Sequence, residues 1–119
     1  LIEYLQALLD VTEGLEDIKL VRSIRAVDEL SRPVIVVKTN ALQKLAAAPI
    51  RNFMGTFTLT LVSQHKDIDK AEDDLEARLE ILLPKLFTWG MSWQSADQAQ
   101  FDERHICYDI AVSSIYKGE

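Results

Sequence analysis

The sequence predicts an α+β fold: a two-layer sandwich in which two helices pack on a mainly antiparallel sheet of about four strands. Two segments, one at the N-terminus and one past the middle of the chain, carry apolar residues at helical spacing. The remaining apolar segments are β-branched runs or alternate apolar with polar residues, as strands do. The chain has 119 residues and contains no linker or internal repeat, so we expect one domain over 1–119.

The N-terminal LIEYLQALLDVTEG predicts an amphipathic helix, with Gly14 as a suitable stop. Its apolar side consists of Ile2, Leu5, Leu8 and Leu9. The segment lacks the basic start and the small-residue cleavage site of a signal peptide. We therefore interpret it as part of the fold. The single cysteine, Cys107, cannot form an internal disulfide, which fits synthesis in a reducing cytoplasm.

A second helix is predicted over 68–86, with Asp67 as its N-cap. At 100° per residue its apolar residues fall within an arc of about 120°, as expected for a helix that lies on a sheet. These residues are Ile68, Ala71, Leu75, Leu79, Leu82, Leu83 and Leu86. Pro84 removes one backbone hydrogen bond and should kink or tighten the last turn. The helix is expected to end near Trp89 and Gly90.

Strands are predicted at VIVVKT (34–39), which Pro33 opens, and at TFTLTLVS (56–63), which alternates cleanly. In the latter, Phe57, Leu59 and Leu61 share one face. Residues 91–101 and 104–116 should form a closing pair of strands. In the last strand one face carries Ile106, Tyr108, Ile110 and Val112. Residues 18–25 alternate only partly, which leaves open whether they form a short strand.

The segment NALQKLAAAPIRNFMG (40–55) is too long and too apolar for an ordinary hairpin loop. We predict an arm with one or two helical turns that becomes ordered against a partner, because its large apolar side chains are costly to leave in water. These are Leu42, Leu45, Ile50, Phe53 and Met54. The alternative is a loop that folds back on the core.

Charge is distributed unevenly along the chain, whose net charge is −6. Residues 19–51 hold seven bases, Arg22, Arg25 and Arg51 among them, against two acids, a net charge of +5. Residues 67–103 hold ten acids against three bases, a net charge of −7. The overall charge argues against a general nucleic-acid binder. This separation of positive and negative segments favours head-to-tail contact between copies of the chain. Alternatively, each charged side chain is simply exposed to solvent.

Five acids of the second helix form an acidic flank without a base among them: Asp69, Glu72, Asp73, Glu76 and Glu80. Three pairs in this flank are like-charged at i,i+4, each costing roughly 0.2–0.5 kcal/mol. Asp74 and Arg78 form a favourable pair on the neighbouring face. Such a flank could bind a basic partner surface, or its negative charge could serve to repel other negative groups. A solvent-exposed helix face without a further role remains the simplest interpretation.

Motifs for catalysis or metal binding are absent from the sequence. His65 and His105 lack HxxxH or HExxH spacing, no serine stands in GxSxG, and no EF-hand spacing occurs. Cys107 alternates with apolar neighbours and is predicted to be a buried structural thiol. We expect no enzyme, no cofactor and no metal, and no apolar run is long enough for a membrane span.

Two apolar residues, Ile81 and Phe87, project from the polar sides of the second helix. Together with Trp89 and Trp93 they form a candidate subunit contact. The alternative is that the tryptophans pack in the core.

The chain resembles the tail terminator (tail-completion) proteins of long-tailed bacteriophages. The resemblance rests on PVIVVKT, the long connecting segment, GTFTLTLVSQHKDIDKAEDDLEARLEILLPKL and the closing TWGMSWQSADQAQFDERHICYDIAVSSIYK. It covers most of the chain, best over 55–117 and least over 14–33.

The resemblance implies a homo-hexameric ring at the head-proximal end of the virion tail, without cofactor or catalytic residues. Such a ring ends polymerisation of the tail tube protein and offers a docking surface to the head–tail connector protein. DNA would pass through the channel without specific binding. Candidate subunit or tube contacts are Arg22, Arg25, Leu42, Leu45, Ile50, Arg51, Phe53, Met54, Ile81 and Phe87. Candidate channel-lining acids are Asp69, Asp73, Glu76 and Glu80.

Alternatives remain open for the flank and for the protein. The acids could instead contact Arg22, Arg25 or Arg51 of the next subunit. The chain could also be another neck or minor tail protein that joins head and tail, or a small cellular α+β module that binds a ligand or partner.

Overall fold

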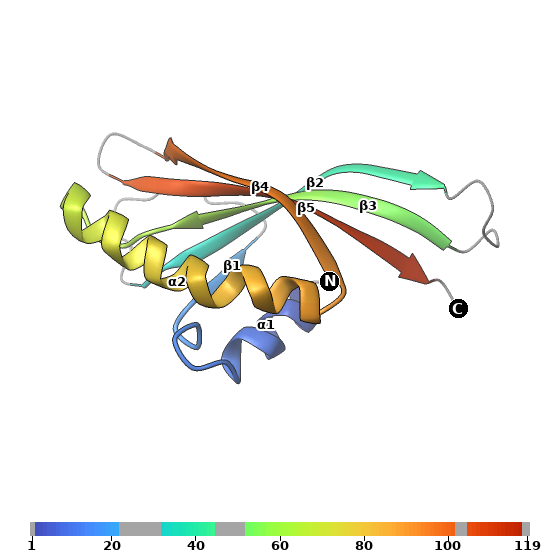
Figure 1. Cartoon of the computed structure of the whole chain (residues 1–119), viewed down its shortest axis with the longest axis horizontal. Coiled ribbons are helices and arrows are strands. Elements are labelled where there is room, and N and C mark those ends of the chain that lie inside the picture. The colour runs from blue at the N-terminus through green and yellow to red at the C-terminus, as the bar shows by residue number, and fades with distance from the viewer. Residues whose placement is uncertain (1, 22–31, 45–51, 102–104, 118–119) are drawn as a thin grey trace.

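The fold, shown by a computed structural model in Figure 1, has two helices and five strands within the described residues 2–21, 32–44, 52–101 and 105–117. The predicted α+β class is confirmed. The elements in chain order are α1 (Ile2–Asp10), β1 (Lys19–Val21), β2 (Val34–Lys44), β3 (Asn52–Val62), α2 (Ile68–Thr88), β4 (Met91–Gln100) and β5 (Ile106–Lys117).

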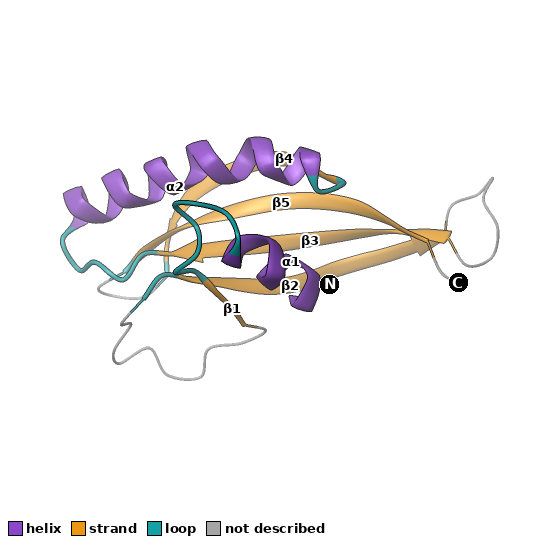
Figure 2. Cartoon of the chain, turned by 90° about the horizontal axis from the view of Figure 1, so that it is seen from below, coloured by secondary structure: helices purple, strands orange, loops and turns teal. Residues whose placement is uncertain are grey.

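The strands form one sheet in the order β1-β2-β3-β5-β4. Strand β1 pairs with β2 in parallel, and every other pairing is antiparallel. The partly alternating segment 18–25 therefore contributes a short strand, and the described sheet has five strands rather than about four. Both helices lie on one face of the sheet, with α2 along β4 and β5 and α1 toward β1 (Figure 2).

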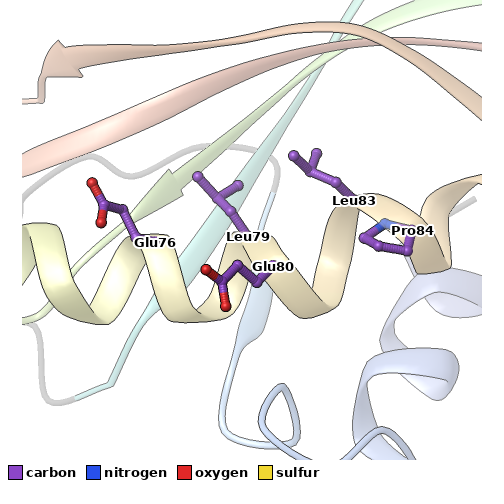
Figure 3. Close-up of a pocket in the computed structure, with 5 residues that line it drawn as sticks. All are labelled: Glu76, Leu79, Glu80, Leu83 and Pro84. Atoms are coloured by element: carbon purple, nitrogen blue, oxygen red, sulfur yellow. The ribbon is translucent and has the colours of Figure 1, made fainter.

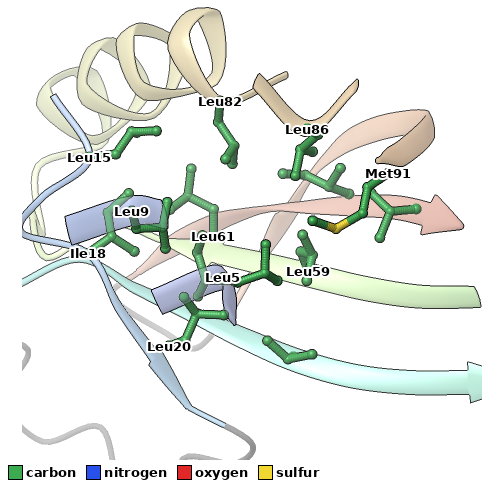
Figure 4. Packing of buried hydrophobic residues seen from close by; sticks show 14 of the residues in the cluster. Leu5, Leu9, Leu15, Ile18, Leu20, Leu59, Leu61, Leu82, Leu86 and Met91 are labelled. Atoms are coloured by element: carbon green, nitrogen blue, oxygen red, sulfur yellow. The ribbon is translucent and has the colours of Figure 1, made fainter. Parts of the chain in front are cut away.

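The hydrophobic core fills the space between the helices and this face of the sheet (Figure 4). The predicted inward face of β3 is confirmed, because Phe57, Leu59 and Leu61 are all buried. From β5, Ile110 and Val112 enter the same cluster, and Ile106 and Tyr108 pack against it. The helices contribute Leu5, Leu9, Leu75, Leu79, Leu82 and Leu86.

The limits of α2 follow the local signals. The carboxylate of Asp67 accepts a hydrogen bond from the backbone N–H of Lys70 at 3.2 Å, which confirms the N-cap. At the other end Gly90 adopts a φ of +86°, a conformation that favours glycine. Pro84 does not end the helix, which continues to Thr88. The prediction for Ile68 is wrong: its side chain is 61% exposed, since the first turn of α2 lies near the end of the sheet.

The predicted arm over 40–55 is wrong in its secondary structure where the structure describes it. Residues 40–44 extend β2 and residues 52–55 belong to β3, paired in register from Ala41 with Thr56 to Lys44 with Phe53. The register of β2 against β3 shifts by one residue between Thr39 and Ala41, as at a β-bulge, and the two strands remain paired beyond this shift. Strand β3 is also paired with β5 along its whole length. Pairing on both sides satisfies the backbone of β3, and this outweighs the helical propensity of the segment.

The longest dimension of the molecule follows the strands, with extents of 48 × 27 × 22 Å. Strands β2, β3 and β5 run past the ends of both helices (Figures 1 and 2). We define the distal extension as residues 41–44 of β2, 52–55 of β3 and 115–117 of β5. The described part of the predicted arm thus belongs to a projection of the sheet formed by β2, β3 and β5.

Candidate functional site: an acidic groove beside an edge strand

The acidic flank lies on the side of α2 that faces away from α1. On the α1 side, Arg78 reaches the connection between α1 and β1, where it contacts the carboxylate of Asp17 at 2.6 Å and the carbonyl of Gly14 at 3.1 Å. On the other side, Glu72 accepts a hydrogen bond from the Gln98 amide of β4 at 3.3 Å. These contacts fix the rotation of α2 about its axis, so that the acidic flank lies on the β4 side of the helix.

The four predicted acids of this flank are all exposed: Asp69, Asp73, Glu76 and Glu80. Among the residues that the structure describes, no ion pair involves any of them. The like-charge repulsion predicted along this flank is therefore not relieved by bases within the described chain.

A groove of about 570 Å³ runs along α2 within this flank. It is lined by Glu76, Leu79, Glu80, Leu83 and Pro84 (Figure 3). In Figure 3 Glu76, Leu79 and Leu83 extend on the side of α2 toward the strands, whereas Glu80 points away from them. We call this feature the α2 groove. Its chemistry is apolar with two flanking negative charges, which suits an apolar segment that carries basic residues.

The neighbouring strand β4 is an edge strand whose described hydrogen-bonded neighbour is β5. Most of its side chains are exposed, and it has ten residues, which is long for an edge strand. Near the α2 groove, Gln98 also accepts a hydrogen bond from the Tyr108 hydroxyl at 3.4 Å. Burial raises the pKa of Tyr108, and the charges of Glu76 and Glu72 raise it further.

The predicted patch around Ile81 and Phe87 divides into exposed and covered residues. Phe87 is 79% exposed and Trp93 is 41% exposed, so both remain available for a contact. In contrast, Ile81 and Trp89 are partly buried and pack against the core. The core-packing alternative is thus right for Trp89 and not for Trp93.

Of the other predicted contacts, three lie in the distal extension and five lie outside the described residues. Leu42 is in β2, and Phe53 and Met54 are in β3. Arg22, Arg25, Leu45, Ile50 and Arg51 lie outside the described residues. Of the bases in the positive segment, Lys19, Arg32 and Lys38 are described and exposed, all on or beside β1 and β2. These bases and the acidic flank therefore lie toward opposite edges of the sheet.

The described residues include no group of three or more His, Cys, Asp or Glu side chains arranged to hold a metal ion. Cys107 is 3% exposed. Burial, and secondarily the charge of Asp109, raises its pKa to about 11, so the thiol is protonated and unreactive at neutral pH. No described helix is long and apolar enough to cross a membrane.

Two features escaped the sequence interpretation. One is the contact of Arg78 with Asp17, since residues 61 positions apart carry no local signal. The other is the cross-strand register of Asp97 on β4 with Asp109 on β5, which places two acids opposite each other. Thr60 of β3 donates a hydrogen bond to Asp109 at 2.7 Å, and this helps to hold that carboxylate. The alternation of apolar and polar residues in both strands was the sequence signal from which the pairing of Asp97 with Asp109 could have been predicted.

No protein-family model matches the chain, and no curated protein matches it.

Proposed function

We propose that this protein is a structural subunit of a bacteriophage tail, which forms a homo-hexameric ring at the head-proximal end of the tail tube. The ring would end tube polymerisation and present the docking surface for the head–tail connector protein. The proposal starts from the sequence resemblance to tail terminator proteins. The fold supports the proposal, because the resemblance implies an α+β subunit and this fold belongs to the α+β class.

The observation that carries the proposal furthest is the polarity of the subunit. The α2 groove and its acids lie beside the β4 edge, while exposed bases lie on or beside β1 and β2. Two different complementary surfaces on one subunit produce head-to-tail contacts, which close into a ring or continue as a filament. A ring of such subunits requires neither a catalytic group nor a cofactor.

The first experiment measures the absolute mass of the purified protein by light scattering over a concentration series, with negative-stain imaging of the largest species. Six copies of the 13.5 kDa chain give a mass of 81 kDa. A ring of this mass with a central hole is the expected result. Because some rings close only on a tube end, a monomer would next be mixed with tail tubes.

Capping of the tubes and arrest of their growth support a terminator. Binding to the isolated connector without any effect on tubes indicates a head–tail joining protein. A strict monomer that binds neither tubes nor connector disproves the proposal and favours a small cellular binding module.

A further inference from the structure

We infer that the outer edge of β4 over residues 95–100 binds an extended segment of a partner protein, which joins the sheet as a further strand and places two adjacent basic residues beside Asp97 and Glu72. We call residues 95–100 the acidic edge. Neither these residues nor Glu72 line the α2 groove. The inference goes beyond the proposed function, because it concerns a partner of different sequence and not the contact between copies.

The backbone of the acidic edge is available for pairing. Among the described residues β4 pairs with β5 alone, in an unbroken register from Ser95 to Gln100. Edge strands are commonly protected against further pairing by Lys, Pro or a bulge. The register of β4 shifts only before Ser95, and the strand contains neither Lys nor Pro. The acidic edge is therefore a regular six-residue template for another strand.

Negative charge lies on both faces of the sheet at this edge. Asp97 pairs across the strands with Asp109, a like-charged pair on the face without helices, because Asp109 alternates along β5 with Ile110 of the core. On the helix face, the next residue of β4, Gln98, donates a hydrogen bond to Glu72 at 3.3 Å. Within the described part of the chain, no ion pair involves any of these three acids.

The two acidic faces determine the chemistry of the partner segment. Successive side chains of a strand point to opposite faces, so two adjacent basic residues would lie beside Asp97 on one face and Glu72 on the other. A base across from Asp97 would also relieve its repulsion with Asp109. Because the negative charge repels nucleic acid and anionic lipid, a basic polypeptide fits this edge best.

A second copy of the chain fits the acidic edge less well. Pairing of two β4 strands would add the acids of one copy to those of the other, and like charges oppose such a contact. The opposite edge of the described sheet is β1, which has three residues and one base, Lys19. This strand can neither cover six residues nor supply adjacent bases. A different protein is therefore the favoured occupant.

Synthetic peptides test the inference on the full chain. The probe is an eight-residue peptide of alternating threonine and valine with two adjacent arginines at its centre, labelled for fluorescence anisotropy. Three matched peptides carry two central glutamates, or arginines separated by one residue, or N-methylated backbone nitrogens. We expect each to bind at least about fivefold more weakly, because each removes the charge match, the placement on both faces or the backbone hydrogen bonds.

Variants of the protein test the two acids. Asp97→Asn and Glu72→Gln should each weaken binding of the dibasic peptide by about threefold to tenfold. The matched control is Glu3→Gln with Glu13→Gln, two exposed acids on the α1 side, which should leave binding unchanged. Circular dichroism establishes that each variant folds. In the unmodified protein, the peptide should slow hydrogen exchange over 95–100 and leave β1 unchanged, and this measurement needs no variant.

The outcomes separate this inference from the proposed function. Equal binding of all four peptides, or protection elsewhere than over 95–100, means that strand addition at the acidic edge is wrong. Protection of 95–100 by self-assembly without peptide assigns the edge to a second copy and also overturns the inference. A ring that does not bind the dibasic peptide disproves the inference alone. A protein that binds the peptide but assembles under no condition, with or without tail tubes, disproves only the proposed function.

Discussion

Arg78 is the residue that most clearly joins distant parts of the chain. Its side chain is 13% exposed, and it contacts Asp74 one helical turn away as well as Asp17 and the Gly14 carbonyl. The sequence predicts the Asp74 contact, because i,i+4 pairs are neighbours on any helix. The Asp17 contact depends on how the α1–β1 connection packs on α2, which no local pattern encodes.

We expect Arg78→Met to lower the free energy of unfolding by about 1–3 kcal/mol, because it removes several charged hydrogen bonds at a mostly buried site. Lys70→Met on the same helix is the control, and this exposed substitution should change stability by less than about 0.5 kcal/mol. Urea denaturation monitored by tryptophan fluorescence measures both. Equal effects of the two substitutions would contradict a joining role for Arg78.

The same contact makes a prediction for acid pH. The hydrogen bond from Arg78 holds the pKa of Asp17 below the ordinary value of 3.8. Its contribution to stability is therefore present above pH 3.8 and is lost as the pH falls through the lower pKa of the folded state. The loss of stability below this pH should be smaller in Asp17→Asn than in the unmodified protein. Denaturation series at neutral and acid pH provide the measurement.

At the scale of elements, the sequence predicts α2 well in the middle and less well at its first turn. Its N-cap, its buried stripe and its end near Gly90 follow from local chemistry and helical period. The exposure of Ile68 depends instead on where the sheet ends, and that is a property of the assembled fold. The extension of β2 and β3 likewise depends on pairing with β5, so the apolar residues alone did not distinguish strand from arm.

Two glycines that follow helices provide a further prediction. Gly14 and Gly90 have φ of +91° and +86°, so an alanine at either position should cost about 1–2 kcal/mol from the backbone alone. At Gly90 nothing lies within 4 Å of the added methyl group, whereas at Gly14 it would lie 2.5 Å from Cδ1 of Ile81. Gly14→Ala should therefore destabilise the protein more than Gly90→Ala does.

The background Ile81→Val removes that Cδ1 atom and tests the explanation. In a double-mutant cycle, the excess cost of Gly14→Ala should largely disappear in Ile81→Val. An unchanged excess would mean that the contact with Ile81 is not its cause.

The acidic flank leads to opposite predictions for the monomer and for the assembly. Glu76 takes part in two like-charged i,i+4 pairs, with Glu72 and Glu80, so Glu76→Gln should stabilise the monomer by roughly 0.4–1 kcal/mol. The same change removes one carboxylate of the α2 groove and should weaken assembly. Glu13→Gln, an exposed acid outside the helices, is the matched control. Unfolding below the assembly concentration and light scattering above it measure the two effects, and a loss of monomer stability would contradict the repulsion.

At the scale of the whole molecule, the fold class, the order of elements and the polarity of charge could all be predicted from the sequence. The position of the acids beside the β4 edge could not, because it depends on the strand order β5-β4 and on the rotation of α2. The same holds for the candidate site: four exposed acids were identified individually, yet the α2 groove also needs Leu79, Leu83 and Pro84, which line it together with Glu76 and Glu80. Local patterns determine which residues face outward, and topology determines which of them meet.

Salt provides the most direct test of assembly at this scale. Charges at a partly exposed interface are screened over about 10 Å at 0.1 M salt and about 3 Å at 1 M, so assembly through the α2 groove should weaken as salt rises. Glu76→Gln with Glu80→Gln should assemble less readily at low salt and show little further dependence on salt, because the groove then contributes no charge. Light scattering of both proteins across this range measures the effect. If the unmodified protein instead assembles more strongly in salt, apolar residues such as Phe87 and Trp93 dominate the contact, and the acidic flank has another role.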